Sequence, residues 1–159
     1  MTLYHGSSTA VEKPDLSFSR LRTDFGKGFY LTPLKTQAER WAERFLRERG
    51  MGVVSEYAFT PIPDKEVKIL SFSDYSVEWL DFIMSCRRGV PVDAEWDLVI
   101  GGIANDKVFD TLQLYFDDLI RAEEAIRRLQ YRTPNIQHCF KTQSVIDSCL
   151  RFAGSEVLK

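Results

Sequence analysis

The sequence is poor in the residues that build metal centres and disulfide frameworks. Its 159 residues include two histidines and three cysteines. The cysteines, Cys86, Cys139 and Cys149, are odd in number and far apart, and no Cys-x-x-Cys pair is present. This distribution argues against a disulfide framework and against a structural zinc site. We expect reduced, buried thiols, as in a cytoplasmic protein.

The sequence also lacks long apolar runs and an excess of one charge. No run reaches the roughly 18 apolar residues of a membrane-spanning helix, so we expect no membrane contact. The first residues do not join a basic region to an apolar one, so we expect no secretory signal. The 21 Lys and Arg are interleaved with 23 Asp and Glu, and the net charge is −2. This balance argues against nucleic acid as the primary partner.

The composition suits one packed domain over residues 1–159. Hydrophobic residues make up 44% of the chain and aromatic residues 13%, which is enough for a core. Alternating apolar positions and helical i, i+3, i+4 spacings together predict an α+β fold. Strands are expected at 2–5, 29–32, 53–59, 67–70, 97–102 and 135–142. Helices are expected at 33–49, 76–88, 107–130 with room for one break, and 144–153, with Gly154 as a stop.

Two short segments and one tryptophan carry the functional signal. His5 ends an apolar start, Tyr30 follows the turn at residues 26–28 (Gly-Lys-Gly), and Trp41 lies eleven residues later on a helix. Such an arrangement outlines a pocket for a flat aromatic ring joined to a ribose, and so predicts NAD⁺ as a substrate. Each feature alone also has an ordinary structural interpretation. A lone His5 suits a structural histidine, Trp41 suits a helix core, and the two glycines suit a plain turn, since no third glycine or βαβ unit completes a dinucleotide motif.

The residues around these positions resemble a known class of enzymes. Residues 4–7 (Tyr-His-Gly-Ser) and 25–30 (Phe-Gly-Lys-Gly-Phe-Tyr) resemble the first two motifs of ADP-ribosyltransferases of the diphtheria-toxin and poly-ADP-ribose-polymerase type, which use a His–Tyr–Glu triad. The whole chain resembles the bacterial domain-of-unknown-function 3990 family, with further matches at residues 96–109 and 135–140. This resemblance implies a single ADP-ribosyltransferase-like domain, a split antiparallel β-sandwich with flanking helices.

The resemblance also implies a role for each matching residue. His5 would bind a hydroxyl of the nicotinamide ribose, and the Gly6 backbone would hold the carboxamide. Tyr30 and Trp41 would enclose the nicotinamide ring, which is cationic in NAD⁺. Arg20 would approach the pyrophosphate, although an exposed loop charge is an equally ordinary interpretation. The predicted NAD-binding residues are His5, Gly6, Ser7, Arg20, Gly28, Tyr30 and Trp41, and the predicted catalytic residues are His5, Tyr30 and Gln137.

Gln137 is where this sequence departs from the triad. By its place on a late strand it stands where a glutamate is usual, and loss of such a charge costs about 3–4 kcal/mol of transition-state stabilisation. Three interpretations stay open: a slow transferase, an enzyme that takes a carboxylate from elsewhere, or a fold that binds NAD⁺ without turnover. An inactivating Glu→Gln change is a further one. Alternatively, Gln137 is a solvent-facing strand residue, and the nearby Gln143 could be confused with it.

Three other patterns invite weaker interpretations. Asn105 and Asp106 suit helix capping better than an acceptor loop. Asp24 suits a cap on the turn before Gly26. His138 and Cys139 are neighbours on a strand, so they point to opposite faces and cannot form a thiol-protease dyad.

The sequence thus predicts a bacterial mono-ADP-ribosyltransferase, a glycosyltransferase that consumes NAD⁺ as a co-substrate and needs no metal. The acceptor is expected to be a macromolecule, with a protein favoured over a nucleic acid by the charge balance, and a small-molecule acceptor also stays open. The resemblance further implies a toxin–antitoxin pair with a small neutralising protein partner. The alternatives are a weak or inactive module that binds NAD⁺ or ADP-ribose, and a protein-interaction domain that binds neither.

Overall fold

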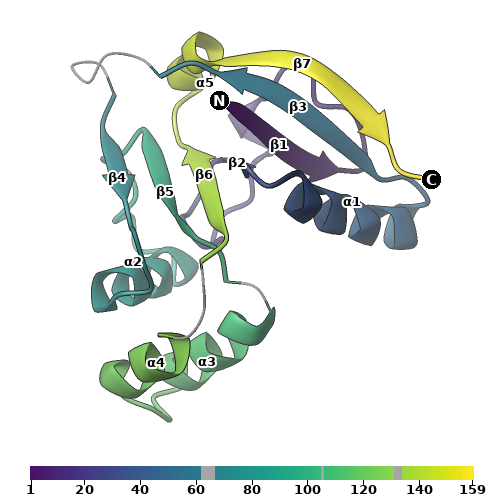
Figure 1. The fold of residues 1–159 in the computed structure, drawn as a ribbon. Coiled ribbons are helices and arrows are strands. Elements are labelled where there is room, and N and C mark those ends of the chain that lie inside the picture. Colours follow the sequence, from purple (N-terminus) through teal and green to yellow (C-terminus); the bar gives the residue numbers. More distant parts are fainter. Residues whose placement is uncertain (62–66, 105, 131–133) are drawn as a thin grey trace.

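The computed structural model describes residues 1–61, 67–104, 106–130 and 134–159 (Figure 1), without the side chains of residues 106 and 107. Two β-sheets and five α-helices make up the described part of the chain. In chain order the elements are β1 (Thr2–Ser7), the 3₁₀ turn η1 (Leu16–Phe18), β2 (Phe29–Leu31), α1 (Lys35–Arg49), β3 (Val53–Phe59), β4 (Ile69–Ser71), α2 (Val77–Arg87), β5 (Leu98–Gly102), α3 (Asp106–Phe116), α4 (Ala122–Leu129), β6 (Ile136–Phe140), α5 (Gln143–Cys149) and β7 (Leu150–Val157).

The first sheet is antiparallel and has the strand order β1-β3-β7. Leu3 of β1 lies opposite Tyr57 of β3, and His5 lies opposite Ser55. The pairing of β3 with β7 shifts register after Glu56, which leaves Ala153 as an extra residue on β7. This is a β-bulge, and it increases the local twist of the strand pair.

The second sheet is mixed and has the order β2-β6-β5-β4. The strands β2, β6 and β5 are antiparallel, but β4 and β5 are parallel, with Ile69 opposite Leu98. The expected α+β class is confirmed, and the expectation of a purely antiparallel arrangement is wrong. A parallel pair needs a crossover connection, and α2 provides it between β4 and β5.

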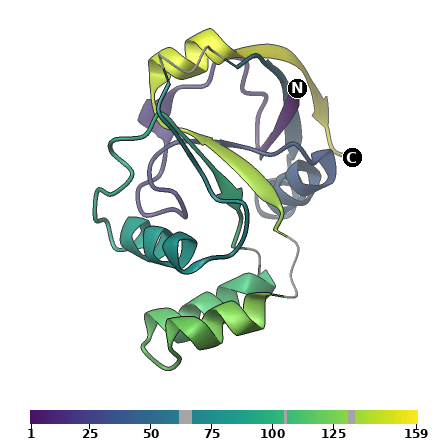
Figure 2. The same ribbon diagram turned by 60° about the vertical axis from the view of Figure 1, so that its left-hand side comes forward.

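The two sheets pack face to face around a shared apolar core. Aromatic rings cross the interface: Phe29 meets Tyr57 at 5.7 Å and Phe59 meets Phe140 at 5.5 Å between ring centroids. The outer faces are covered by helices, with α1 against the first sheet and α2 against the second (Figure 1). α3 and α4 lie side by side beyond α2 (Figure 2) and extend its core. The residues buried between the sheets and under α5 are Leu3, Leu31, Tyr57, Val67, Leu98, Phe140, Val145, Ile146 and Cys149.

Local sequence explains where the two main helices begin and end. α1 ends at Gly50, which has a φ of 76° and donates its N–H to the Leu46 carbonyl at 2.9 Å. A left-handed residue of this kind is a common helix stop because glycine has no Cβ. α2 begins after Ser76, whose hydroxyl accepts the Trp79 N–H at 3.2 Å. Serine is favoured there because its side chain replaces a missing helical partner.

The structure differs from the expected elements in two places. The expected long helix over 107–130 is two helices, α3 and α4, and Asp118 between them has a φ of 56°. The expected helix at 144–153 is wrong beyond Cys149, because the chain passes directly from α5 into β7. Gly154 therefore lies within a strand, opposite Glu56, and does not end a helix.

Candidate functional site

The two predicted motifs meet where the two sheets join at one corner. A short bridge connects them: the Tyr4 N–H donates to the Thr32 carbonyl at 2.8 Å, and the Thr32 N–H donates back at 2.9 Å. Beside this bridge, Nδ1 of His5 lies 2.8 Å from the Tyr30 carbonyl oxygen. His5 and Tyr30, 25 residues apart in the chain, are therefore held together by a direct hydrogen bond.

The same hydrogen bond fixes the form of the His5 ring. A carbonyl can only accept, so Nδ1 carries the hydrogen. Burial lowers the pKa of His5, and the bond to Tyr30 only partly opposes this. The ring is thus neutral at pH 7, and Nε2 has a lone pair that can accept a hydrogen bond. Phe29 supports the ring at 4.6 Å between centroids. This chemistry suits a ligand hydroxyl.

The Tyr30 hydroxyl ties the Gly26 turn together. It accepts the Phe25 N–H at 3.0 Å, lies 2.7 Å from the Thr23 hydroxyl, and donates to the Gly26 carbonyl. Gly26 has a φ of 74°, a conformation that favours glycine. Burial raises the pKa of Tyr30 well above its ordinary value, so the phenol stays protonated. The hydroxyl therefore has a structural role, and the half-buried ring is the part available to a ligand.

Gln137 lies on the same face of the second sheet as the Tyr30 side chain. Tyr30 pairs with Cys139, and Gln137 is two residues away from Cys139 along β6. Because side chains alternate along a strand, Gln137 and Cys139 share a face. Gln137 is only 2% exposed, and its Nε2 has no hydrogen-bond partner among the described residues. The alternative of a solvent-facing strand residue is therefore wrong.

Two buried polar residues near Gln137 were not predicted as site residues. Thr32 is fully buried, and its hydroxyl lies 3.1 Å from Oε1 of Gln37 and 3.2 Å from the Ile136 carbonyl, one residue before Gln137. Gln37, in the first turn of α1, is 6% exposed, and its Nε2 also lacks a partner among the described residues. The sequence feature that could have identified Gln37 is its position: it is a polar residue four positions before Trp41, on the buried face of an amphipathic helix.

Trp41 is half-buried on α1, one turn after Gln37. The residues that pack α1 onto the first sheet are Ala38 and Ala42, with Val54 of β3. Trp41 is not among the buried core residues, and its ring touches no other ring in the described part of the chain. Its interpretation as a helix core residue is not supported, and the predicted aromatic pair with Tyr30 stays a prediction.

Both predicted glycines have packing reasons that need no ligand. A Cβ on Gly6 would lie 2.1 Å from the Ala38 carbonyl oxygen, so β1 and α1 can approach only at a glycine. A Cβ on Gly28 would lie 2.3 Å from Sγ of Cys139. Close backbone approach is a common reason for glycine in a strand, as for Gly6 in β1, whereas Gly28 precedes β2 and makes room for the Cys139 side chain. The binding roles of Gly6 and Gly28 stay predictions.

Ser7 and Arg20 do not take part in the hydrogen bonds that connect the two motifs. The Ser7 hydroxyl donates to the Thr9 carbonyl at 2.5 Å, within the turn that follows β1. Arg20 is exposed and takes part in none of the ion pairs between described residues. A guanidinium in this position can meet an approaching anion, but nothing in its surroundings requires one.

One protein family accounts for almost the whole chain. Residues 1–152 match the family described as Protein of unknown function (DUF3990). The chain belongs to the DUF3990 family. No curated protein and no solved structure matches it. The predicted link from DUF3990 to ADP-ribosyl transfer therefore stays a prediction.

Asp24 lies in the loop of residues 23–28 before β2, called the motif loop below, and in this DUF3990 protein it is a structural anchor. Asp24 pairs with Arg87 of α2, whose Nε lies 2.9 Å from Oδ1, and it accepts the Ala104 N–H at 3.2 Å. The interpretation of Asp24 as a cap on the Gly26 turn is wrong, because Thr23 makes that contact at 2.6 Å. Of the expected capping pair, Asn105 and the side chain of Asp106 lie outside the described residues.

The cysteines and His138 are buried away from solvent. All three cysteines are free thiols. Burial raises the pKa of Cys86 and of Cys139 to about 12, so neither is a thiolate at neutral pH. Burial lowers the pKa of His138 to about 4. His138 lies opposite Leu31 and Cys139 opposite Tyr30, which confirms that the two side chains point to opposite faces.

No helix among the described residues is long and apolar enough to cross a membrane.

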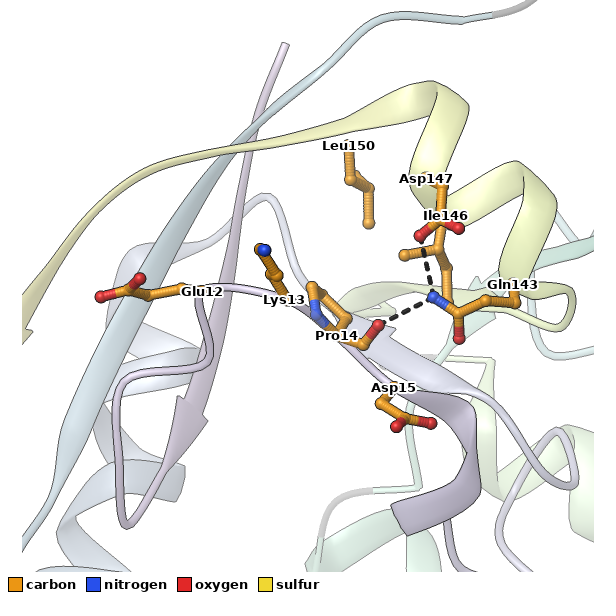
Figure 3. Close-up of a pocket in the computed structure, with 8 residues that line it drawn as sticks. All are labelled: Glu12, Lys13, Pro14, Asp15, Gln143, Ile146, Asp147 and Leu150. Carbon is orange, nitrogen blue, oxygen red and sulfur yellow. Dashed lines mark hydrogen bonds between the residues drawn. The ribbon is translucent and has the colours of Figure 1, made fainter.

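A separate cleft of about 530 Å³ lies between residues 12–15 and α5 (Figure 3). Gln143 closes one side of it: Nε2 donates to the Pro14 carbonyl and to Asp147, each at 2.9 Å, and Oε1 accepts the Leu16 N–H at 3.1 Å. The Gln143 amide is thus bonded at both ends, and Gln143 lies on α5 beside this cleft and not on β6 with Gln137. The cleft contains none of the predicted NAD-binding residues; its lining is Glu12, Lys13, Pro14, Asp15, Gln143, Ile146, Asp147 and Leu150.

Proposed function

We propose that this DUF3990 protein is an NAD-dependent mono-ADP-ribosyltransferase with a macromolecular acceptor. What supports the proposal most is the convergence of three distant segments at one corner: His5 bonds Tyr30, and Thr32 connects the same strand to the carbonyl that precedes Gln137. The grouping of His5, Tyr30 and Gln137 as a triad comes from the resemblance; the strands that carry them, β1, β2 and β6, lie next to one another at this corner.

In the proposed reaction the bond between ribose C1 and the nicotinamide nitrogen breaks, and nicotinamide leaves as a neutral molecule. A nucleophile on the acceptor forms the new bond to C1 and loses its proton. His5 accepts a hydrogen bond from a ribose hydroxyl through Nε2, since Nδ1–H is engaged by Tyr30. The Tyr30 ring supports the cationic pyridinium ring, and Trp41 covers its other side. NAD⁺ is consumed in this reaction and is not recycled.

Gln137 sets the rate in this proposal. An uncharged amide can hold a ribose hydroxyl but does not stabilise the positive charge that develops at C1 as nicotinamide leaves. A second candidate function follows from the same observation: a module that binds NAD⁺ or ADP-ribose and does not turn it over. A protein acceptor and a small neutralising partner belong to the proposal through the family resemblance alone.

The first experiment is calorimetry with NAD⁺, comparing the native protein with Tyr30→Ala. Binding that Tyr30→Ala removes would support the pocket. Absence of binding by the folded native protein would contradict both the transferase and the NAD-binding module, and would favour a protein-interaction domain.

The second experiment measures nicotinamide release by Gln137→Glu. If the pocket is formed but lacks its charge, the new carboxylate should raise the rate by about two to three orders of magnitude. The assay is best run near pH 8, because burial raises the pKa of a carboxyl group. The matched control is Gln143→Glu, which changes a glutamine outside the site and should leave the rate as it is. An unchanged rate in Gln137→Glu, with NAD⁺ binding intact, would favour the binding module.

A further inference from the structure

Buried polar side chains are few in this fold, and three of them gather beside the proposed site. Thr32, Gln37 and Gln137 are each at least nine-tenths buried. The Thr32 hydroxyl lies 3.1 Å from Oε1 of Gln37 and 3.2 Å from the Ile136 carbonyl. This hydroxyl therefore joins the first turn of α1 to the start of β6, where Gln137 follows directly.

Both glutamines in this group keep an amide nitrogen that no described residue pairs with. Nε2 of Gln37 and Nε2 of Gln137 have no hydrogen bond to any described residue. Buried polar groups in folded proteins are nearly always bonded, because an unpaired buried donor is strongly unfavourable. Two buried donors that lie at either end of the Thr32 link and have no partner among the described residues are therefore better explained by a ligand that pairs with them than by the needs of the fold.

The chemistry of the two amides limits what that ligand presents. Thr32 holds the oxygen end of Gln37, so the nitrogen end is the one left over. Each Nε2 offers hydrogens and no charge. The complementary groups are oxygen acceptors, such as hydroxyl or carboxamide oxygens, and not cations. Trp41 lies one turn after Gln37, and residues at i and i+4 share a helix face, so a ring surface lies on the same side.

We propose that Gln37 is a second substrate-binding residue of the site, and that Gln37 and Gln137 together donate hydrogen bonds to oxygen atoms of the nicotinamide-riboside half of NAD⁺. This inference rests on the proposed function. It adds a residue that the sequence motifs do not include, and it assigns the first turn of α1 to substrate recognition.

The test measures the melting temperature and the NAD⁺ affinity of two variants, Gln37→Met and a matched control. Gln37→Met keeps the volume of the side chain and removes the unpaired donor. Without NAD⁺ the melting temperature should change by no more than a few degrees: the bond from Thr32 to Oε1 is lost, but the Thr32 hydroxyl keeps the Ile136 carbonyl as a partner and an unfavourable buried donor is gone. The affinity for NAD⁺ in calorimetry should fall about tenfold or more, because the ligand oxygen then faces a methionine.

Gln143→Met is the matched control, because the Gln143 amide is bonded at both ends and lies outside the site. Its melting temperature should fall and its NAD⁺ affinity should stay unchanged. A Gln37→Met protein that melts more than a few degrees below the native protein, fails to fold, or binds NAD⁺ equally well would overturn the inference. If the native protein binds no NAD⁺, the proposed function itself fails, and this is a different result from a native protein that binds NAD⁺ as well as Gln37→Met does.

Discussion

Tyr30 combines two roles that a single substitution can separate. Its hydroxyl ties Phe25 and Gly26 of the motif loop, while its ring lies beside Phe25 with centroids 6.5 Å apart. We predict that Tyr30→Phe lowers the free energy of unfolding by about 1–3 kcal/mol, because the Phe25 N–H and the Gly26 carbonyl lose a buried partner. Urea unfolding measures this loss.

The same variant should affect the binding of NAD⁺ less than Tyr30→Ala does, because phenylalanine keeps the ring. Equal losses of affinity in the two variants would contradict a ring-only role. An unchanged unfolding free energy in Tyr30→Phe would show that the loop does not depend on the hydroxyl.

His138 gives the stability of the protein a defined pH dependence. Its pKa is lowered to about 4 by burial, whereas an unfolded histidine titrates near 6.5. Above about pH 6.5 the ring is neutral in both states. As the pH falls from about 6.5 to 4, the unfolded chain takes up a proton that the folded protein does not, so the free energy of unfolding falls by about 3 kcal/mol.

His138→Phe should remove this part of the slope because phenylalanine does not titrate, and the Phe59 ring, 6.1 Å from that of His138, already gives the position an aromatic neighbour. The measurement is the difference between the native and variant stability curves from pH 8 to pH 4. Parallel curves would contradict the assignment. His5, whose pKa is also lowered by burial, contributes in the same direction. A variant that replaces both His5 and His138 should therefore show a still smaller change of unfolding free energy with pH.

Single residues of the site were predictable only where they belong to a motif. The resemblance picked out His5 and Tyr30, and these are in direct contact. Gln37 belongs to no motif, and its one signal, a polar residue one turn before Trp41, does not reveal that it is buried until α1 is placed on the sheet. Burial of Gln137 depends on strands that neighbour β6 in space and not in sequence, so the local pattern could not distinguish it from an exposed residue.

At the scale of elements, the contact between β1 and α1 depends on one missing methyl group. Gly6→Ala would place Cβ 2.1 Å from the Ala38 carbonyl oxygen, and backbone atoms cannot move aside cheaply. We predict a loss of about 2 kcal/mol or more in unfolding free energy, with weaker NAD⁺ binding because α1 carries Gln37 and Trp41.

Gly154→Ala is the matched control, because it lies in the same sheet and a Cβ there meets nothing within 4 Å. Its stability should change by no more than about 0.5 kcal/mol. A similar loss in both variants would point to a general intolerance of side chains in this sheet and would contradict the helix-contact explanation.

The elements that the sequence predicted well are those with a strong local period. α1 and α2 repeat apolar residues at helical spacing and have clear ends at Gly50 and Ser76. β7 was missed because it follows α5 without a turn residue and contains a bulge at Ala153, which interrupts the alternation. Its partner β3 lies about 95 residues earlier, at positions 53–59, and a pairing over that distance leaves little trace in local periodicity.

At the scale of the whole molecule, one buried cation connects three segments around the site. Nζ of Lys141 donates to Asp93 and to the Phe25 carbonyl, each at 2.5 Å. The Lys141 side chain is 5% exposed and that of Asp93 is 17% exposed. The absence of a side chain at Gly26 makes room for the carboxylate, since a Cβ there would lie 2.3 Å from it. The end of β6, the motif loop and the loop before β5 are thus held by one charge.

Removal of this cation should loosen the site as well as the fold. Lys141→Met leaves the Asp93 carboxylate partly buried without its partner, and we predict a loss of roughly 3 kcal/mol or more in unfolding free energy. Adding Asp93→Asn should restore part of that loss, because the unpaired charge is gone, and a double-mutant cycle in urea gives the coupling between the two residues. Lys35→Met is the control: Lys35 also contacts a carboxylate, Glu156 at 2.7 Å, but both side chains are exposed, so its substitution should cost far less stability than Lys141→Met. Equal losses at the two lysines, or a double variant less stable than Lys141→Met, would contradict the view that Lys141 holds these three segments together.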